Sequence, residues 1–553
     1  MPAVAQTFKD FRVSAARQFA HTMIVIDDEA SQTQKPPKIV KLKTPSRLSP
    51  ARPPTVAAND EPIPGGKHAL DAKALIDNAM NLGLVCSVLR PKKGENIRVQ
   101  MKRVAERADI ICLDWEIYKD GGVAATKIIK DIVSDDSKRN GRLRLIAIYT
   151  GDVTNNEILK KVIGAFSVSF QNKHDLNREP LYISSNSGLR IVCLFKSHGV
   201  QLTEPRSENQ VSEQGLPARL LEEFAMLSDG LLSSVALATI AAIRSSTHHV
   251  LAKISRNLDG PYFHHRAVLP NVSDAEEYAV DVVLSELKNS VDKQGVAAIY
   301  AGPMAIEARI REIAAGAQTL ALRWDDKGAK QFDVDVAQVV RLVSEGVAPA
   351  HEGVTGQKPK KAIFEKELST FFSKDRDSAH TEMREFAALT GVRAHPGSSP
   401  YNDGNSVPSL GLGAIIQAPD GTYLMCLQAS CDSVRLKKKS DFLFIPLTVN
   451  EEQPDHVVPV VEKGEVRPLG LSISQRSYAS ALSISFAPSA NTETVVAVRI
   501  ARRRGIHFAS AGGISYRWIA SLKQRRALRT AQRLGQDMGR LGFDEFEPFR
   551  RKE

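Results

Sequence analysis

Five polar positions, each at the end of a short apolar run, have the residue types for phosphoryl chemistry. Asp27 and Asp28 end MIVIDD, Asp114 ends ADIICLD, Thr150 ends LIAIYT and Lys196 ends IVCLFK. A carboxylate that attacks a phosphoryl donor needs hard oxygen ligands for Mg²⁺ and a cation, because both neutralise charge on the transferring oxygens. Mg²⁺ and the ammonium group would also allow three neighbouring carboxylates to stay ionised near neutral pH.

Parallel strands are the elements that must position these residues. In a doubly wound parallel sheet, the carboxyl ends of the strands converge on one crevice. The helical patterns HALDAKALIDNAMNLGL and ENIRVQMKRVAERA alternate with the apolar runs, as βα units require. The sequence therefore predicts an α/β fold in which a doubly wound parallel sheet brings all five residues to one edge.

The order and types of these residues resemble the receiver domain of bacterial response regulators, a CheY-like doubly wound fold. The resemblance implies that Asp27 and Asp28 bind Mg²⁺ and that Asp114 accepts the phosphoryl group while also binding the metal. It implies that the hydroxyl of Thr150 contacts the phosphoryl group and that Lys196 pairs with it.

The segment after the third strand extends the resemblance. DWEIYKDGG places a Gly-Gly turn before a helical stretch, which is similar to the turn before the third helix of receivers. This similarity implies that the carbonyl group of Glu116 is a further Mg²⁺ ligand. Lys196 is followed by Ser197, where the family usually has a cis proline.

Two insertions make this receiver-like region longer than a minimal receiver. A Pro-rich insertion at residues 31–66 separates the first acids from Asp114, and its prolines exclude a helix or a central strand. The second insertion, SFQNKHDLNREPLYISSNSG, lies between Thr150 and Lys196; its sequence is loop-like and could fold as a flap.

Two alternatives to an active receiver remain open, and a third is excluded by motif and chain order. The strand-end charges could be ordinary loop charges around a Rossmann-like core, or the region could be a pseudo-receiver that is not phosphorylated. Phosphatases of the haloacid-dehalogenase type also use an Asp after a strand, followed by Thr and Lys. Their D-x-D motif needs a second Asp where this chain has Glu116 in Asp114-Trp115-Glu116. Their acid pair also comes last in the chain, whereas the acid pair of this chain comes first.

Length and composition indicate a multidomain globular protein. The chain has 553 residues, of which 42% are hydrophobic and 25% charged. We expect a receiver-like domain at 1–228 that begins with an amphipathic leader over 1–20. A mainly helical connector at 229–350 and a mixed α/β output domain at 351–553, ending in a basic helix, are expected to follow. The output domain shows apolar runs such as LGAIIQ, TYLMCLQ and TVVAVRI, which are typical of a mostly antiparallel sheet.

Cysteine usage and hydropathy favour a cytoplasmic location. The five cysteines have no spacing that indicates a disulfide framework. The longest apolar stretch, LLSSVALATIAAI, is too short to cross a bilayer, so we expect no membrane span.

Positive charge is concentrated near the C-terminus. Between positions 499 and 540 the sequence contains eleven Lys and Arg residues and only one acidic residue, an Asp. Arg525, Arg529 and Arg533 follow a helical spacing, and Trp518, Leu522 and Leu534 could supply the inward face. Such a stripe suits an anionic partner, either nucleic acid or an acidic protein, although a solvated helix face has the same composition.

These observations predict a phosphorelay signal-transduction protein rather than an enzyme. As a two-component response regulator, it would be a phosphoprotein that uses Mg²⁺, with Asp114 accepting a phosphoryl group from a histidine kinase or phosphotransfer protein. The phosphoryl group would switch the C-terminal output region. The alternatives are a non-phosphorylated pseudo-receiver scaffold and a nucleic-acid-binding effector that uses the basic C-terminal helix.

Overall fold

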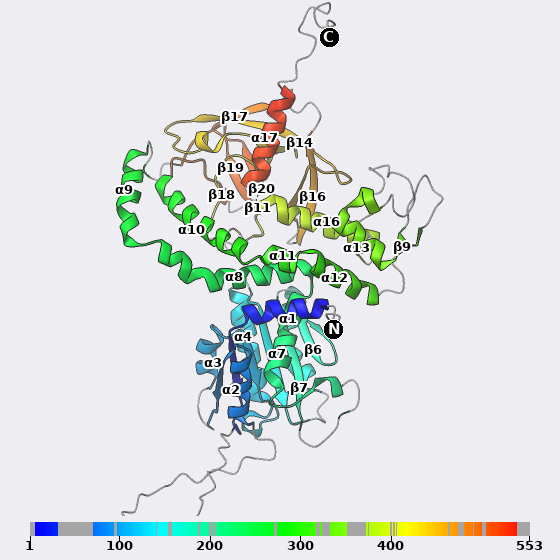
Figure 1. Ribbon diagram of the computed structural model, residues 1–553. Coiled ribbons are helices and arrows are strands. Elements are labelled where there is room, and N and C mark those ends of the chain that lie inside the picture. The colour runs from blue at the N-terminus through cyan, green and yellow to red at the C-terminus, as the bar shows by residue number, and fades with distance from the viewer. Residues whose placement is uncertain are drawn as a thin grey trace, which may run out of the picture. The chain divides into compact units, whose positions relative to one another are not determined.

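The chain forms two compact units in the computed structural model, Met1–Leu320 with Val334–Lys358 and Ala321–Asp333 with Pro359–Glu553 (Figure 1). The predicted Pro-rich insertion at 31–66 lies outside the residues that the structure describes. Those described residues are 6–30, 70–92, 97–139, 141–152, 157–185, 188–197, 202, 206–269, 272, 274–316, 321–322, 332–333, 335–350, 372–373, 375–398, 401, 404, 406–462, 465–473, 480–489, 492–499 and 505–538.

The first unit contains the predicted parallel sheet. Its strand order is β2-β1-β3-β4-β7-β6-β5, and the first five of these strands are parallel to their neighbours. β3 and β4 are buried along their whole length, as expected for strands covered on both faces. The predicted α/β fold with a doubly wound sheet is confirmed. The parallel strands are β1 (Thr22–Ile26), β2 (Val85–Leu89), β3 (Ile110–Leu113), β4 (Arg144–Thr150) and β7 (Leu189–Lys196).

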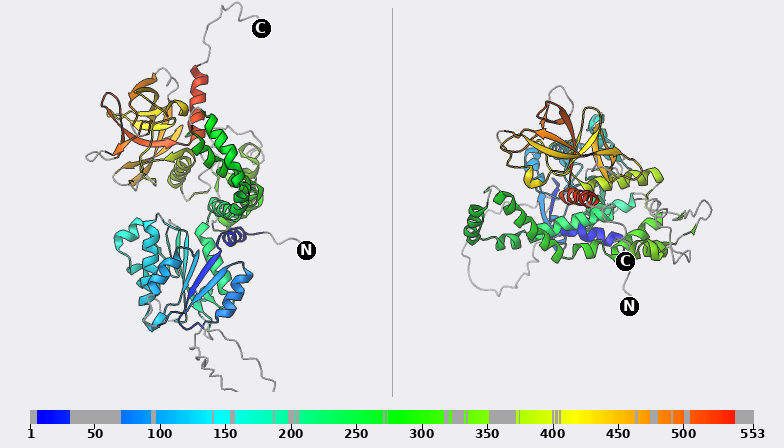
Figure 2. Two further views of the ribbon diagram at one scale, coloured as in Figure 1. Left: turned by 90° about the vertical axis from the view of Figure 1, so that its left-hand side faces the viewer. Right: turned by 90° about the horizontal axis from the view of Figure 1, so that it is seen from above.

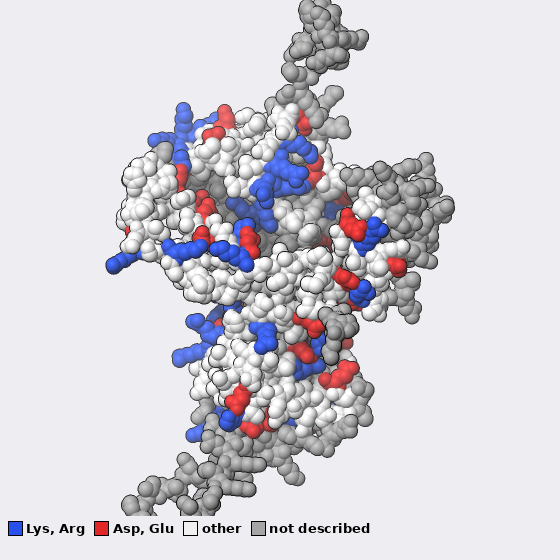
Figure 3. Space-filling view, viewed as in Figure 1, with Lys and Arg blue, Asp and Glu red and all other residues white. Residues whose placement is uncertain are grey.

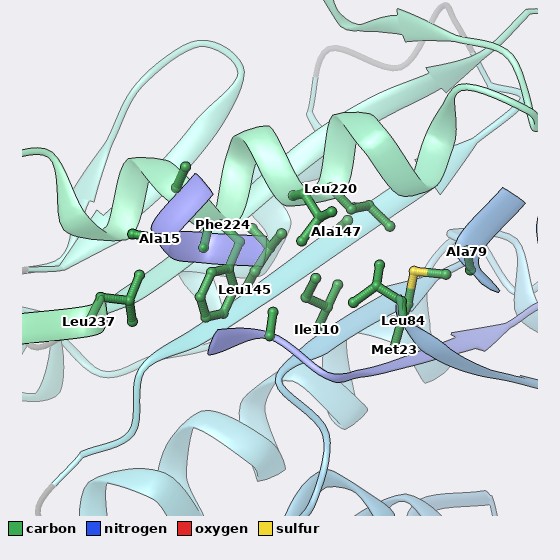
Figure 4. Packing of buried hydrophobic residues seen from close by; sticks show 14 of the residues in the cluster. Ala15, Met23, Ala79, Leu84, Ile110, Leu145, Ala147, Leu220, Phe224 and Leu237 are labelled. Atoms are coloured by element: carbon green, nitrogen blue, oxygen red, sulfur yellow. The ribbon is translucent and has the colours of Figure 1, made fainter. Parts of the chain in front are cut away.

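Helices cover both faces of this sheet because the strand side chains alternate between two hydrophobic clusters. Figure 4 shows one cluster, in which Met23, Ile110 and Leu145 of the strands pack with Leu220 and Phe224. The helices of this face are α2 (Ala72–Asn81) and α7 (Leu216–Ala225). The helices of the opposite face are α3 (Ile97–Ala105), α4 (Val123–Lys138) and α5 (Ile158–Gly164).

The second insertion extends the sheet, so the predicted flap is wrong. After α6 (Val168–Lys173), the strands β5 (Asn177–Arg178) and β6 (Tyr182–Ser185) form an antiparallel pair, and β6 pairs with β7. Ile183 is only 1% exposed and belongs to the core. The insertion therefore covers what would otherwise be an open edge of the sheet.

A short strand pairing explains why serine replaces proline after Lys196. β8 (Gln210–Val211) pairs in parallel with the end of β7, with Lys196 opposite Val211. The backbone N–H group of Ser197 donates to the carbonyl oxygen of Val211 at 3.3 Å. Proline has no N–H group and could not make this bond.

The N-terminal helix α1 (Phe8–Phe19) is part of the core of the first unit rather than a separate leader. Its buried face includes Phe8, Phe11 and Ala15, and it packs against α7 and α8 (Figure 1). Arg12, which is buried, forms ion pairs with Asp229 and with Glu312, the latter at 2.8 Å. The helices that follow α7 are α8 (Leu231–Lys253), α9 (Asp259–Val268), α10 (Asp274–Lys293), α11 (Val296–Tyr300), α12 (Pro303–Gly316) and α13 (Val336–Glu345).

Among the described residues, no single helix is long and apolar enough to cross a membrane. Only the sharply bent pair Leu216–Ser228 and Leu231–Lys253 passes that test of length and composition together.

The second unit is built on an antiparallel sheet with the order β15-β16-β14-β13-β12-β20-β19-β18. Two more strands, β11 and β17, pair with β20 and β14. Its long strands are β14 (Ser440–Val449), β15 (His456–Glu462), β16 (Glu465–Ile473) and β20 (Ser515–Leu522). The shorter strands are β11 (Val392–Ala394), β12 (Ala414–Gln417), β13 (Tyr423–Cys426), β17 (Leu482–Phe486), β18 (Val498–Arg499) and β19 (Ile506–Ala509). A separate two-stranded pair consists of β9 (Ala321–Leu322) and β10 (Phe332–Asp333).

Helices α16 (Arg376–Gly391) and α17 (Gln524–Met538) pack on this sheet, and Figure 2 shows α17 in red beside it. Ala527 and Leu534 form the buried face of α17. The predicted inward face was partly wrong, because Trp518 and Leu522 belong to β20.

Two neighbouring glycines, Gly121 and Gly122, form the turn before α4, and substituting each in turn tests how tightly this turn is packed. Gly122 has φ +84°, and a Cβ atom on it would lie 2.1 Å from the ring of Trp115, which is fully buried. Gly121 has φ +68° but no atom within 4 Å of such a Cβ. We expect Gly122→Ala to lower the free energy of unfolding by about 2–3 kcal/mol more than Gly121→Ala, because only the first adds a clash to the backbone strain. Urea unfolding of the two variants measures this difference, and equal losses would contradict it.

Candidate functional site: an acid and lysine cluster at the carboxyl edge of the parallel sheet

Lys196, the last residue of β7, connects the ends of β1 and β3. Its Nζ donates to Oδ2 of Asp27 and to Oδ2 of Asp114, both at 2.8 Å. Lys196 is 2% exposed and Asp27 is 1% exposed. The Nζ atom also lies 5.6 Å from the ring centroid of Tyr149, whose hydroxyl donates to the carbonyl oxygen of Val211 at 3.0 Å. The parallel sheet therefore holds this ammonium group between two carboxylates in a largely dry environment.

Asp114 is the more accessible of the two carboxylates that bind Lys196. Its side chain is 11% exposed, against 2% for the side chain of Asp27. The backbone N–H of Asp114 donates to the carbonyl oxygen of Ile26 at 2.8 Å, which continues the β1 and β3 pairing by one residue. Its Oδ1 accepts from the backbone N–H of Glu116 at 3.0 Å. Asp114 is thus held on both oxygens while still reaching solvent.

Asp28 is held by the loop that follows β3. Its Oδ2 accepts from the backbone N–H of Tyr118 at 3.1 Å. Tyr118 and Lys119 have φ values of +62° and +55° within the short helix η1 (Ile117–Lys119). Residues other than glycine rarely adopt this left-handed backbone conformation, and such strained residues cluster at functional sites.

Thr150 and Glu116 lie at the same edge, but each accepts a hydrogen bond from a residue of the loop that follows it. The side chain of Thr150 is fully buried, and its Oγ1 accepts from the backbone N–H of Asp152 at 3.0 Å. Thr150 is paired across the sheet with the residue that precedes Lys196. The carbonyl of Glu116 accepts from Lys119 N at 2.7 Å. The structure therefore joins three of the predicted residues by direct side-chain bonds and places the other three around them.

The charged forms of the two adjacent acids are destabilised. Burial raises the pKa of Asp27 to about 6, and the charge of Asp114 acts in the same direction, although the ammonium group of Lys196 opposes both. Burial is also the main cause of the raised pKa of Asp28, assisted by the charges of Asp114 and Glu29. A divalent cation bound beside these carboxylates would relieve the repulsion.

The donor set fits Mg²⁺ in chemical type. The predicted ligands, which are Asp27, Asp28, Asp114 and the carbonyl of Glu116, supply the hard oxygen atoms that this ion prefers. Among the residues that the structure describes, no group of three or more His, Cys, Asp or Glu side chains is already arranged around one point to hold a metal. The predicted ligand set therefore stays a prediction.

The raised pKa of Asp27 predicts a stabilising substitution. A carboxyl group whose pKa rises from 3.8 to about 6 on folding stabilises the fold at low pH, and this contribution is lost as pH rises through about 6. Two pKa units correspond to about 3 kcal/mol. We expect Asp27→Asn to increase stability by about 1–3 kcal/mol at pH 8 and to reduce the fall in stability between pH 4 and 6. Hydrogen exchange of β4 at several pH values measures this change, and a less stable variant at pH 8 would contradict it.

Sequence reasoning missed Tyr149, which lies beside the predicted Thr150. A phenol group next to a strand-end hydroxyl, inside an otherwise apolar run, was the available signal. Burial raises the pKa of Tyr149, which keeps its hydroxyl group protonated as a donor to Val211.

The predicted anion-docking residues lie on α17 in the second unit. Arg529 and Arg533 line a cavity with residues of β15 and β16, whereas Arg525 is exposed and is not among the residues that line it. The Nη1 atom of Arg533 is 3.1 Å from Oδ1 of Asp455. The structure thus brings together two of the three predicted arginines.

Comparison with protein families supports the interpretation of the parallel sheet. Residues 19–201, about a third of the chain, match the family model described as a response receiver domain. This segment includes β1 to β7 and all six predicted residues of the acid and lysine cluster. The segment is similar to a receiver domain, and the C-terminal region is not assigned by this match. Comparisons with curated proteins and with solved structures gave no match.

Proposed function

We propose that the receiver-like segment, residues 19–201, accepts a phosphoryl group on Asp114 within a phosphorelay. The family match supports phosphorelay signalling at a coarse level. The observation that carries the assignment to one residue is the geometry of Asp114. It is the partly exposed carboxylate at the end of β3, and both of its oxygens accept hydrogen bonds, from Lys196 and from Glu116 N.

The side chains around Asp114 suit this transfer. An oxygen of Asp114 attacks phosphorus, the bond from phosphorus to the donor's leaving group breaks, and an acyl phosphate forms. Lys196 offsets the negative charge that the new phosphoryl group brings. The hydroxyl of Thr150 accepts from Asp152 N, so its own proton can be donated to a phosphoryl oxygen. Mg²⁺ held by Asp27, Asp28, Asp114 and the carbonyl of Glu116 would neutralise charge on the transferring oxygens.

In this proposal the protein is a cytoplasmic response regulator rather than an enzyme. A histidine kinase or phosphotransfer protein donates the phosphoryl group. The output passes from the receiver to the following helices, since α7 and α8 share one hydrophobic cluster with the sheet. A pseudo-receiver scaffold remains the second candidate, because the cluster lacks a ready three-ligand metal group among the described residues.

Labelling of the whole chain tests the proposal. Incubation with acetyl phosphate and Mg²⁺ should add the mass of one phosphoryl group to the peptide that contains Asp114, in a form that hydroxylamine removes. Chelation of Mg²⁺ with EDTA should prevent the labelling. Failure of labelling, by acetyl phosphate and by a cognate kinase alike, would favour the pseudo-receiver scaffold.

A further inference from the structure

A cavity of about 190 Å³ lies in the second unit, at the junction of α17 with the start of β15 and the end of β16. This volume is several times the roughly 30 Å³ that one water molecule occupies in the liquid. Lys and Arg side chains gather over α17 on this face of the molecule (Figure 3). The residues that line the cavity are Asp455, His456, Ile473, Arg526, Arg529, Thr530 and Arg533.

Asp455 fixes two of the three arginines at the cavity. Its Oδ1 is 3.1 Å from Nη1 of Arg533, and its main-chain carbonyl accepts a hydrogen bond from Arg526. Its Oδ2 accepts from the backbone N–H of Ile473 at 2.9 Å, which ties the carboxylate to β16. Both guanidinium groups are therefore oriented by the sheet instead of moving freely with solvent.

Arg529 lies between these two arginines in sequence and on the same side of the helix. Within the described part of the chain, its side chain makes no ion pair or hydrogen bond. Its five N–H donors are therefore available to a ligand.

The inner wall of the cavity carries buried polar groups. His456 is 4% exposed, and its Nδ1 has no hydrogen-bond partner among the described residues. Its Nε2 lies 3.5 Å from Oγ1 of Thr530, which is 7% exposed. A buried ring nitrogen without a partner is costly, and its presence indicates a place where a ligand or a water binds. Burial lowers the pKa of His456 to about 4. The charges of Arg526 and Arg533 also lower this pKa, whereas the charge of Asp455 raises it. The imidazole is therefore neutral near pH 7.

We propose that this cavity binds a dianionic phosphate group, either inorganic phosphate or the terminal phosphate of a monoester. Three arginines against one aspartate leave the cavity with a net charge of +2, since His456 is neutral. A phosphate monoester carries a charge of about −1.5 to −2 near neutral pH, so it matches this charge more closely than a phosphodiester, which carries one. Guanidinium groups suit phosphate because their planar donors can bond to two oxygens at once.

This site differs from the stripe of arginines predicted from spacing alone. The cavity uses Arg526, Arg529 and Arg533, whereas Arg525 lies off the cavity. The proposal does not depend on phosphoryl transfer at Asp114, which lies in the other unit.

Isothermal titration calorimetry of the whole chain with inorganic phosphate tests the site. EDTA is included so that Mg²⁺ cannot recruit phosphate to the acid and lysine cluster. We expect saturable binding of one phosphate that Arg529→Gln weakens about tenfold or more, because a charged hydrogen-bond donor is lost. Arg525→Gln removes the same charge from the next turn of the helix and should change the affinity less than about twofold, since that residue does not line the cavity.

Two probes separate the sources of the phosphate group. Glycerol 3-phosphate should compete with inorganic phosphate if the site accepts monoesters, and its failure to compete would restrict the site to the free ion. An oligonucleotide without a terminal phosphate contains only diesters and should compete poorly. Equal weakening by Arg525→Gln and Arg529→Gln, together with strong competition by that oligonucleotide, would overturn the proposal in favour of backbone contacts along the whole helix. Absence of saturable phosphate binding would also overturn it.

Discussion

Asp114→Asn is expected to lower phosphoryl incorporation from acetyl phosphate at least about 100-fold, because an amide cannot replace a carboxylate as the nucleophile. The substitution keeps the size of the side chain, and Oδ1 can still accept from Glu116 N. The fold should therefore survive while the chemistry stops. Intact-protein mass spectrometry after a fixed incubation measures the labelled fraction.

Asp120→Asn is the matched control for this loss. Asp120 lies in the same loop, and its carboxylate caps α4 by accepting from the backbone N–H groups of Gly122 and Ala124, at 3.0 and 2.7 Å. Asparagine also caps helices well, so this variant should be labelled as the wild type is. Labelling that persists in Asp114→Asn, or that disappears in Asp120→Asn, would place the acceptor at another residue.

Lys196→Met is expected to destabilise the first unit by about 3–5 kcal/mol. Methionine keeps most of the apolar stem, but the variant leaves Asp27 buried without its cation and removes a hydrogen-bond donor from Asp114. A buried charge that loses its partner costs far more than a surface pair. Hydrogen exchange of the β4 amides should therefore be about 100-fold faster or more.

The control is Lys160→Met on α5. Lys160 is 53% exposed and pairs with Glu157 three residues away, so its loss should change stability by less than about 0.5 kcal/mol. Adding Asp27→Asn to Lys196→Met should recover part of the lost stability, since it removes one of the two uncompensated carboxylates. If the double variant were as unstable as Lys196→Met, the loss would come from packing and not from charge.

The strand-end positions could be predicted because the apolar runs before them have the length and composition of buried strands. The runs before Asp114 and Thr150 are buried on both faces, and such continuous apolar segments bounded by turns are typical of central parallel strands. The predicted parallel orientation of the strands then placed their carboxyl ends at one edge. The bond between Lys196 and Asp27 could not be predicted as a distance, because it depends on the register of strands far apart in sequence.

Other features had no clear sequence signal. The pair β5 and β6 forms through backbone hydrogen bonds within a polar segment, so its composition is typical of a loop. Trp518 and Leu522 are four residues apart, a spacing that fits a helix face as well as one face of a strand, and the strand in fact ends at Leu522. The apolar face of α1 was visible in the sequence, but nothing in the sequence identified the helices that cover it.

The place of α1 has a consequence for how the protein is synthesised. Ser14 bonds to the hydroxyl of Tyr300, and Arg12 pairs with Glu312, 300 residues later in the chain. At about 5–20 residues per second, a ribosome needs roughly 15–60 s to add 300 residues. Arg12 and Ser14 on α1 thus wait for partners that leave the ribosome much later. The apolar face of α1 can pack once α7 and α8 have been made, whereas the buried Arg12 gains its partner Glu312 only at the end of that interval.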